Sequence, residues 1–349
     1  MDARSREVNV TSDFDRYPIR GGRAVLLSAF LAMAPMMVAL AQSQNAGSCL
    51  GQSATSTTTC INNLISAVPA PGGEVYFPAG TYPINGSLNM RNGVDLRGEG
   101  RYATTVLYSG SGGSAVNGLG SPSQRIIFTI SDMTFDGTPA TGSADGIILG
   151  DNQRSNPLLQ RVRIVSFPRY GIHFAGENWD LSFDHTEIST NGMRVTNGSG
   201  VFKDVSFAPP SVPDLNAVSF NSCLIEGNGS SSSAAGGVFL QSTSSGPMKQ
   251  IVFRDSVIEE NVGSDQLFVA YASGLVLDGV YGESDEPHDA QVLFEIDHSS
   301  GTVSGTRVAI GPATGSYPQS IGIKVTSSPN MVLDTVVYSG PWGANTVIQ

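Results

Sequence analysis

The sequence predicts an all-β solenoid in which short strands wind around a prism, with one short helix at the N-terminal end. Residues 72–100 read as three short strands, because apolar residues stand at every second place between Gly, Pro or Asn. From Ile126 onward a pair of strands recurs at intervals of roughly 20 to 30 residues, as expected of a solenoid. The chain also contains 41 Gly among 349 residues and only 14% charged residues, which is typical of a turn-rich β fold.

The stretch Gly72–Gly100 resembles a known family. Its strands are joined by corner sequences in which Pro fixes φ and Gly or Asn accepts a positive φ. These strands are Glu74–Phe77, Tyr82–Ile84 with Leu88–Met90, and Val94–Arg97. GGEVYFPAGTY followed by GVDLRGEG resembles the first coil of pectate-lyase-like right-handed parallel β-helices, most of all the branch shared with rhamnogalacturonases and family 28 glycoside hydrolases. The resemblance implies a single-stranded right-handed parallel β-helix over residues 60–349.

The N-terminal residues are typical of an exported protein. Ala24–Ala41 is an apolar run that follows three Arg residues and ends in small residues, with polar sequence directly after it. Residues 1–41 therefore predict a secretory signal peptide, with a retained membrane anchor as the alternative. We expect a secreted or extracytoplasmic protein that contacts no membrane after cleavage. Residues 42–59 predict a Ser/Thr-rich linker, and Ile61–Val68 predicts a short helix, which by the resemblance caps the open first coil.

Charge and cysteine content limit the partners. The net charge is −11 and the sequence contains no basic run, which argues against nucleic acid as a partner. An acidic polysaccharide would have to bind at a local basic patch. Cys49 and Cys60 both precede the first coil and either form a disulfide or remain two thiols, whereas Cys223 is predicted to be a core residue. Three Cys residues in two different settings do not predict a metal cluster. We expect the protein to be a monomer.

The repeat predicts which side chains are buried and where the loops lie. One strand recurs as LSFDHTEI, VSFNSCLI and IVFRDSVI, and its mate begins after Gly, as in GIHFAG, GMRVTNG and GVFLQS. Identical facing in each coil predicts two inward rows. These rows are Phe183, Phe220, Phe253 and Leu277 in one and Ile172, Met193 and Val238 in the other. Insertions are expected at 137–143, 208–215, 227–236 and 282–290, and long loops on a rigid scaffold are where binding residues gather.

The same alternation predicts an outward ladder on the strands that follow Gly. In GIHF, Ile172 and Phe174 point inward, so His173 points outward, and Arg194 points outward in GMRV. Coils stack about 4.8 Å apart, so equivalent outward residues lie one above another. The predicted ladder is Ile148, His173, Arg194, Phe239, Phe268, Glu295 and Lys324. A row of cations, rings and a carboxylate suits a sugar chain, and the alternative is an ordinary solvated face with two exposed Phe residues.

We predict that His173 and Arg194 form the centre of a sugar-binding groove together with Tyr170 and Lys324. Arg194 would neutralise a uronate carboxylate, and His173 could take or return a proton near neutral pH. Phe239 and Phe268, further along the ladder, would stack on adjoining sugars.

A catalytic carboxylate is implied by the resemblance alone. Ala144-Asp145-Gly146-Ile147 resembles the Thr-Asp-Gly-Ile context of the first catalytic Asp in family 28 hydrolases, so Asp145 is implied as a catalytic residue. Where those enzymes have a pair of Asp residues in the next coil, this chain has Arg169-Tyr170. A hydrolase would then have no evident acid–base pair, and Asp145 could alternatively cap a corner.

Lyase chemistry needs a cation at the uronate carboxylate, either basic side chains or Ca²⁺. A Ca²⁺ ion would take carboxylate oxygens, and Asp180, Asp184 and Glu187 stand close together in WDLSFDHTEI, with a polar corner ladder as the alternative. Residues 286–289, Glu-Pro-His-Asp, are similar to the Asp-Pro-His-Asp of mannuronan epimerases but differ in the first residue. Ca²⁺ is therefore an optional cofactor, and no other cofactor is predicted.

Taken together, the residues and the resemblance predict a secreted protein that acts on an acidic, pectin-like polysaccharide. The reaction would be cleavage of lyase or hydrolase type. The alternative is a non-catalytic carbohydrate-binding or cell-surface β-helix that lacks the catalytic carboxylates, since fold is a poor guide to activity.

Overall fold

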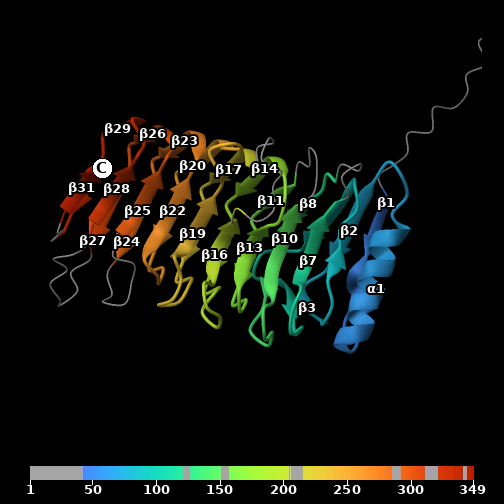
Figure 1. Cartoon of the computed structure of the whole chain (residues 1–349). Coiled ribbons are helices and arrows are strands. Elements are labelled where there is room, and N and C mark those ends of the chain that lie inside the picture. Colours follow the sequence, from blue (N-terminus) through green and yellow to red (C-terminus); the bar gives the residue numbers. More distant parts are fainter. Residues whose placement is uncertain are drawn as a thin grey trace, which may run out of the picture. The chain divides into compact units, whose positions relative to one another are not determined.

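The described part of the computed structural model is built from three long parallel sheets. It covers residues 42–120, 126–150, 157–203, 205, 215–284, 292–310, 321–340 and 344–349. Each coil adds one strand to sheet A, then one to sheet B and one to sheet C, and each strand pairs with its equivalents in the adjacent coils (Figure 1). The described strands make ten such coils, from β2–β3–β4 to β29–β30–β31. The predicted parallel β-helix is therefore confirmed.

The strands have the following bounds. Sheet A contains β1 (Gln42–Asn45), β2 (Gly73–Phe77), β5 (Val94–Gly98), β8 (Thr129–Ser131), β11 (Leu158–Gln160), β14 (Asn178–Asp184), β17 (Leu215–Asn221), β20 (Met248–Arg254), β23 (Ala272–Asp278), β26 (Ser300–Ser304) and β29 (Asn330–Asp334). Sheet B contains β3 (Gly80–Ile84), β6 (Thr104–Tyr108), β9 (Thr134–Asp136), β12 (Arg163–Val165), β15 (Glu187–Ser189), β18 (Leu224–Glu226), β21 (Val257–Glu259), β24 (Tyr281–Ser284), β27 (Arg307–Ile310) and β30 (Val337–Ser339). Sheet C contains β4 (Leu88–Asn89), β7 (Ser114–Leu119), β10 (Asp145–Gly150), β13 (Tyr170–Phe174), β16 (Ser199–Lys203), β19 (Ala235–Gln241), β22 (Asp265–Ala270), β25 (Val292–Asp297), β28 (Ile321–Thr326) and β31 (Ala344–Ile348).

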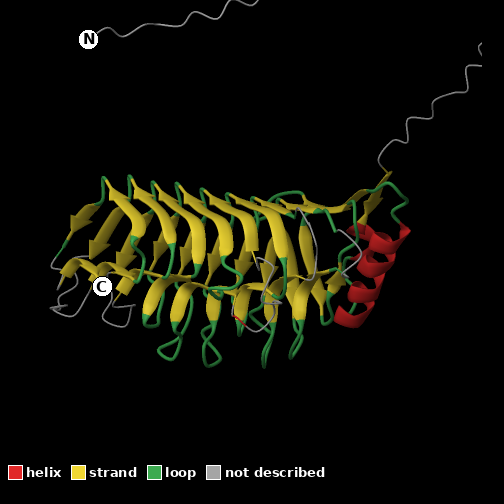
Figure 2. Ribbon diagram, turned by 45° about the horizontal axis from the view of Figure 1, so that its top comes forward, coloured by secondary structure: helices red, strands yellow, loops and turns green. Residues whose placement is uncertain are grey.

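The N-terminal end of the stack is covered by a helix that is longer than predicted. Helix α1 spans Ala54–Ala67 and lies across this end of the stack (Figure 2). It buries Ile61 and Ile65 in the core. The Ser53 side chain accepts a hydrogen bond from the Ser56 N–H and so caps its first turn. The segment predicted to be a linker is instead ordered, because β1 pairs with β2 and a 3₁₀ turn, η1 (Ala46–Cys49), leads into α1. A disulfide joins Cys49 to Cys60 and ties η1 to α1.

Stacked aromatic side chains fill the core, as the alternation predicts. Phe183, Phe220 and Phe253 are aligned in register on sheet A and are fully buried, and Leu277 follows them in the same row. The ring centroids of Phe183 and Phe220 lie 4.5 Å apart, and those of Phe220 and Phe253 lie 4.7 Å apart. Burial of one large apolar residue at each coil supplies the hydrophobic stabilisation of the stack.

The second predicted inward row is wrong at one residue. Val201, rather than Met193, lies between Ile172 and Val238. Met193 is 55% exposed and belongs to the loop that joins β15 to β16. The sheet C strand of this coil therefore begins with Ser199-Gly200-Val201 and not with Gly192.

A ladder of asparagines explains the glycine that opens the sheet C strands. Asn191, Asn228 and Asn261 occupy the same corner, between sheets B and C, in successive coils. The Asn228 Nδ2 donates to the Ile188 carbonyl at 2.9 Å, and its Oδ1 accepts from the Asn191 N–H at 2.9 Å. A Cβ added to Gly200 would lie 2.8 Å from the Asn228 Cγ, so only glycine leaves room for the amide.

Several expectations fall on residues outside the described part. They are the signal peptide at 1–41, most of the insertions at 208–215 and 282–290, and the epimerase-like tetrapeptide at 286–289. Among the residues that are described, no helix is both long and apolar enough to cross a membrane.

Candidate functional site

The outward face of sheet C carries one row of aligned side chains. The strand register orders the row as Asn117, Ile148, His173, Phe202, Phe239, Phe268, Glu295 and Lys324. This order matches the predicted ladder in all but one place, where Phe202 stands instead of Arg194. Because the coils stack about 4.8 Å apart, His173 and Lys324, five coils apart, are separated by roughly 24 Å. Lys324 therefore does not share a subsite with Tyr170 and His173, contrary to the prediction.

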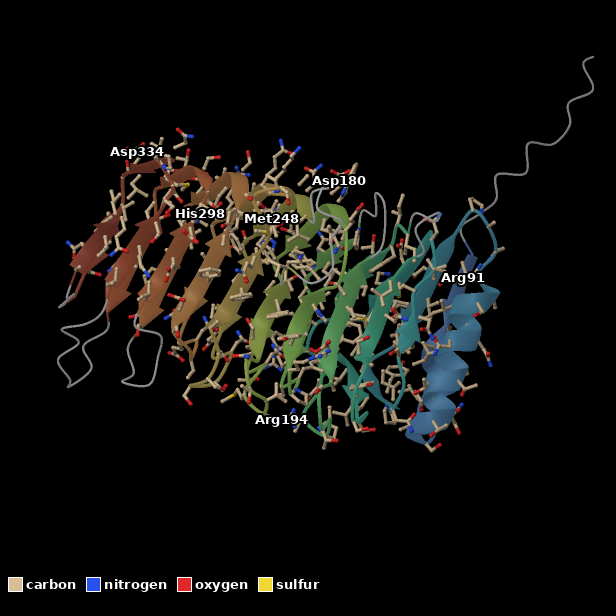
Figure 3. All side chains as sticks on the ribbon, viewed as in Figure 1. Arg91, Asp180, Arg194, Met248, His298 and Asp334 are labelled. Atoms are coloured by element: carbon tan, nitrogen blue, oxygen red, sulfur yellow. A yellow bond between two sulfur atoms is a disulfide. The ribbon has the colours of Figure 1, made fainter. Side chains whose placement is uncertain are left out.

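Arg194 lies in the loop before β16 and not on the sheet C row (Figure 3). Its Nη1 donates to the carbonyls of Thr138 and Ala140, at 3.2 and 2.7 Å. Its Nη2 donates to the carbonyls of Gly137 and Ser166. The guanidinium thus holds backbone segments together, and the predicted partnership with His173 on a neighbouring coil is wrong.

A charged cluster forms where β10 and β13 begin. Arg169 binds Asp145 through two hydrogen bonds, with Nε 2.8 Å from Oδ1 and Nη2 2.6 Å from Oδ2. The His173 Nδ1 lies 2.9 Å from the Asp145 Oδ2. Asp145 and His173 are buried, with 1% and 6% exposed, whereas 31% of the Arg169 side chain is exposed. The Arg169 pKa is raised by its hydrogen bonds to Asp145, so the guanidinium stays charged.

Aromatic rings continue from this cluster along the row. Tyr170 lies edge-on to the His173 ring at 5.0 Å and stacks on Phe202 at 4.0 Å with an interplanar angle of 5°. Phe202, Phe239 and Phe268 follow, with centroids 5.4 and 5.2 Å apart and interplanar angles of 15°. The faces of these rings are turned toward one another, so the ring edges reach the surface. Phe239 and Phe268 are therefore not placed as open platforms for sugar rings, contrary to the prediction.

A pocket of about 410 Å³ lies over the aromatic row in the fourth to sixth coils. Its volume is within the range of small-ligand pockets. The sheet provides its aromatic floor, and the loops before β16 and β19 provide one wall. The described lining residues are Tyr170, Asn197, Phe202, Val205, Ala234, Ala235, Phe239 and Gln241.

A second polar cluster lies at the far end of the row. The Lys324 Nζ contacts the Glu295 Oε1 at 2.8 Å. Asp265, the first residue of β22, is only 6% exposed, and its Oδ1 has no hydrogen-bond partner among the described residues. Burial, together with the neighbouring Glu295 carboxylate, raises the pKa of Asp265 to about 8. Asp265 is therefore expected to hold a proton at neutral pH.

Sequence reasoning missed Arg169, Phe202 and Asp265. A repeat signal for Phe202 exists, because Gly200-Val201-Phe202 matches Gly237-Val238-Phe239 more closely than Gly192-Met193-Arg194 does. A signal for Asp265 also exists, since it opens a sheet C strand as Asp145 does.

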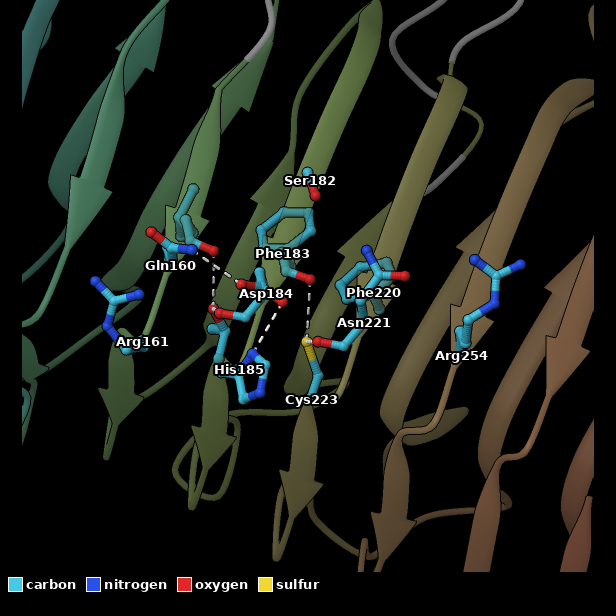
Figure 4. Close-up of polar contacts among 12 residues, drawn as sticks. Gln160, Arg161, Ser182, Phe183, Asp184, His185, Phe220, Asn221, Cys223 and Arg254 are labelled. Atoms are coloured by element: carbon cyan, nitrogen blue, oxygen red, sulfur yellow. Dashed lines mark hydrogen bonds and ion pairs between the residues drawn. The ribbon is translucent and has the colours of Figure 1, made fainter.

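The carboxylates proposed for Ca²⁺ are separated on sheets A and B. Asp184 accepts a hydrogen bond from Gln160 and lies 2.9 Å from the His185 Nδ1 (Figure 4), while Glu187 pairs with Arg163. Asp180 is exposed near the start of β14. Within the described ranges, no three His, Cys, Asp or Glu side chains group closely enough to hold a metal ion. These three carboxylates therefore fit the alternative, a polar corner ladder, rather than a Ca²⁺ site.

Cys223 is a core residue, as predicted. It lies at the corner between β17 and β18, and its Sγ donates to the Phe183 carbonyl at 3.4 Å (Figure 4). Burial raises the pKa of this thiol to about 12, so it is inert at neutral pH.

The fold and this face define a parallel β-helix with an aromatic row and two clusters of paired charges on one sheet. A family model described as rhamnogalacturonase A/epimerase, pectate lyase-like, matches residues 48–207. This part of the chain is similar to pectate-lyase-like parallel β-helix proteins.

Two bacterial epimerases are similar in sequence to part of this chain. The mannuronan C5-epimerases AlgE1 and AlgE3 of Azotobacter vinelandii are 28% identical over 162 residues, which is 41% of this chain but only 12% and 9% of theirs. The chain thus spans about a tenth of the length of these relatives.

Similar solved structures cover most of this chain. The Geobacillus virus E2 protein ORF18 matches with a TM-score of 0.62 at 15% identity, over 87% of this chain and 59% of its own. The A-module of AlgE6 from Azotobacter vinelandii gives 0.56 at 16% identity, over 88% and 98%. The Streptococcus pneumoniae adhesin PfbA gives 0.59 at 11% identity, over 87% and 91%. Identities this low show a common fold alone.

Proposed function

We propose that this chain binds an acidic polysaccharide along the outward row of sheet C and transfers a proton at C5 of a uronate sugar through His173. The observation that carries this proposal is the buried pair of Asp145 and His173, joined by Arg169 at the head of an aromatic row. The partial similarity to mannuronan C5-epimerases supports the same chemistry.

The cluster contains the groups that such a proton transfer requires. When the His173 Nδ1 donates to Asp145, the Nε2 becomes the ring atom that can accept a proton. Arg169 brings a positive charge beside Tyr170, with its Cζ 4.9 Å from the ring centroid. A cation at the uronate carboxylate makes the C5 proton more acidic, because charge that develops on the carboxyl group is stabilised.

Two outcomes share this first step. In elimination, the electron pair of the C5–H bond forms a double bond to C4, and the bond from C4 to the glycosidic oxygen breaks. The oxygen leaves with that electron pair and takes up a proton from water or from the His173 imidazolium. In epimerisation, water supplies a proton to C5 from the opposite face and no bond in the chain is broken. Both start with removal of the C5 proton by a general base.

Hydrolysis fits less well. Glycoside hydrolases hold two carboxyl groups about 5 to 9.5 Å apart so that a nucleophile or water fits between them. The carboxyl groups of Asp265 and Glu295 lie side by side, which leaves no room for a water or a sugar between them. The Asp145 carboxylate is instead paired with Arg169 and His173.

A non-catalytic binding protein is the second candidate, and one observation favours it. His173 is only 6% exposed and Tyr170 only 8%, so a sugar must approach closely to reach either. If the cluster serves only to position an aromatic surface, binding would occur without turnover.

Turnover on a panel of uronans in D₂O tests the proposal. Ultraviolet absorbance of unsaturated uronates reports elimination, and NMR reports exchange or inversion at C5. We expect activity in the wild type and a loss of at least about 100-fold in His173→Ala, in line with removal of a general base. His185→Ala, at an exposed corner of sheet A, should retain full activity. Binding without turnover in the wild type would support the second candidate, and no binding of any uronan would overturn both.

A further inference from the structure

The pocket over the aromatic row differs in character from the charged cluster beside it. Phe202 and Phe239 form its floor, and Ala234, Ala235 and Val205 contribute apolar walls. Its polar groups are the amides of Asn197 and Gln241 and the hydroxyl of Tyr170. None of the described residues that line it carries a charge.

The charged cluster adjoins this pocket at one end. Arg169 and His173 lie against Tyr170, which is shared between the cluster and the pocket. A uronate carboxylate can therefore be accommodated at the cluster. In the pocket, the same carboxylate would lose its hydration without gaining a cation from any of the described lining residues, which is strongly unfavourable.

We infer that this pocket is a subsite for a neutral uronate whose carboxyl group carries a methyl ester. Esterification removes the charge, and the added methyl group can pack against the ring edges and the two Ala side chains. The amides of Asn197 and Gln241 offer donors to the ester carbonyl. The inference rests on the proposed function, because it assigns the sugar next to the one held by Arg169 and His173.

Calorimetric titration with three oligouronates of equal length tests this subsite. One is unsubstituted, one is methyl-esterified on alternate sugars, and one is O-acetylated on alternate sugars. We expect the methyl-esterified form to bind about 10-fold more tightly than the unsubstituted form, the order expected for one small apolar group in a pocket. The O-acetylated form keeps its carboxylates and should gain no such preference, so a preference for it over the methyl-esterified form would overturn the neutral subsite.

Ala234→Leu fills the pocket from an exposed wall position and should abolish the preference for the methyl-esterified oligomer. Ser231→Leu adds a similar side chain to the same loop, at an exposed residue outside the pocket, and should preserve the preference. Equal or tighter binding of the unsubstituted oligomer to the wild type would overturn the subsite while the proposed function stands. Failure of all three oligomers to bind would overturn both. A preference that persists in Ala234→Leu would also overturn the subsite.

Discussion

At the scale of single residues, two aspartates in equivalent positions have opposite surroundings. Asp145 and Asp265 each open a strand of sheet C, and each contacts the outward residue of the next coil. For Asp145 that residue is His173, with Arg169 also bound, so its charge is compensated. For Asp265 it is Glu295, another carboxyl group. One position of the repeat thus supports an ion pair between the third and fourth coils and a protonated aspartate between the seventh and eighth.

Asp265 should make the stability of the protein decrease as the pH rises. Its pKa is raised to about 8 in the folded chain, so between about pH 4 and pH 8 the folded state binds more protons than the unfolded state. The free energy of unfolding then falls with rising pH across this window. We expect the wild-type Tm to drop by several degrees from pH 5 to pH 9 and the Tm of Asp265→Asn to drop less, as measured by calorimetry.

Asp180→Asn is the matched control for this measurement, because Asp180 is exposed on sheet A. Its pH profile should follow the wild type. An Asp265→Asn profile that also follows the wild type would show that Asp265 is not protonated at neutral pH in the folded protein.

At the scale of elements, the asparagine ladder determines where the sheet C strands begin. Each Asn amide lies beneath the glycine that opens the strand, and the corner is held by side chain to main chain hydrogen bonds. The strand start, and with it the facing of His173 and the Phe residues, follows from this packing. The recurring Gly of the sequence is therefore a packing requirement and not only a turn signal.

Gly200→Ala tests this packing. The new Cβ would lie 2.8 Å from both the Asn228 Cγ and the Gly237 carbonyl oxygen, in a corner that cannot easily expand. We expect the free energy of unfolding to fall by about 1–3 kcal/mol, as for other overpacked positions. Urea unfolding measures the change. Gly112→Ala is the matched control, since a Cβ added there would have no other atom within 4 Å, and it should change stability little. Equal effects of the two substitutions would contradict the packing argument.

At the scale of the whole molecule, stability depends on contacts between successive coils. Every described coil contacts mainly its two neighbours, so the first coil needs a cover for its apolar side chains. Helix α1 supplies that cover, and the disulfide between Cys49 and Cys60 anchors it to the turn before it. Loss of the cover would expose the first rows of the core.

Removal of the disulfide should weaken the covered end. Cys49→Ser combined with Cys60→Ser is expected to lower the free energy of unfolding by about 2–3 kcal/mol, mainly because the unfolded chain gains freedom. Urea unfolding under oxidising conditions measures this loss. Ser48→Ala combined with Thr59→Ala changes exposed neighbours in the same two segments and should have a small effect. An unchanged midpoint in the double Cys variant would show that the cover does not limit unfolding.

Much of this architecture could be predicted from the alternation of apolar residues. Because a strand presents side chains to opposite faces with a period of two, local sequence is enough to predict Phe183, Phe220 and Phe253 as one buried row. The same period predicted most of the outward row, including His173 and Phe239. Alternation failed in the fifth coil, where both Met193 and Val201 follow a Gly. There β16 ends in Lys203, which is fully buried. A charged residue at an inward position interrupts the apolar alternation, so the strand was not recognised.

By itself, the sequence determined the fold class, the facing within each strand and the outward position of His173, since these follow from contacts between near neighbours in the chain. Only the tertiary structure decided the contacts of Asp145 with Arg169 and of Asp265 with Glu295. It also decided that Arg194 binds backbone carbonyls of other coils. The residues of each pair are 24 to 57 positions apart in the sequence. Whether they come into contact depends on the number of residues in each coil, which the insertions at the corners determine. Loop length has no periodic signal, so the register between coils is established by packing.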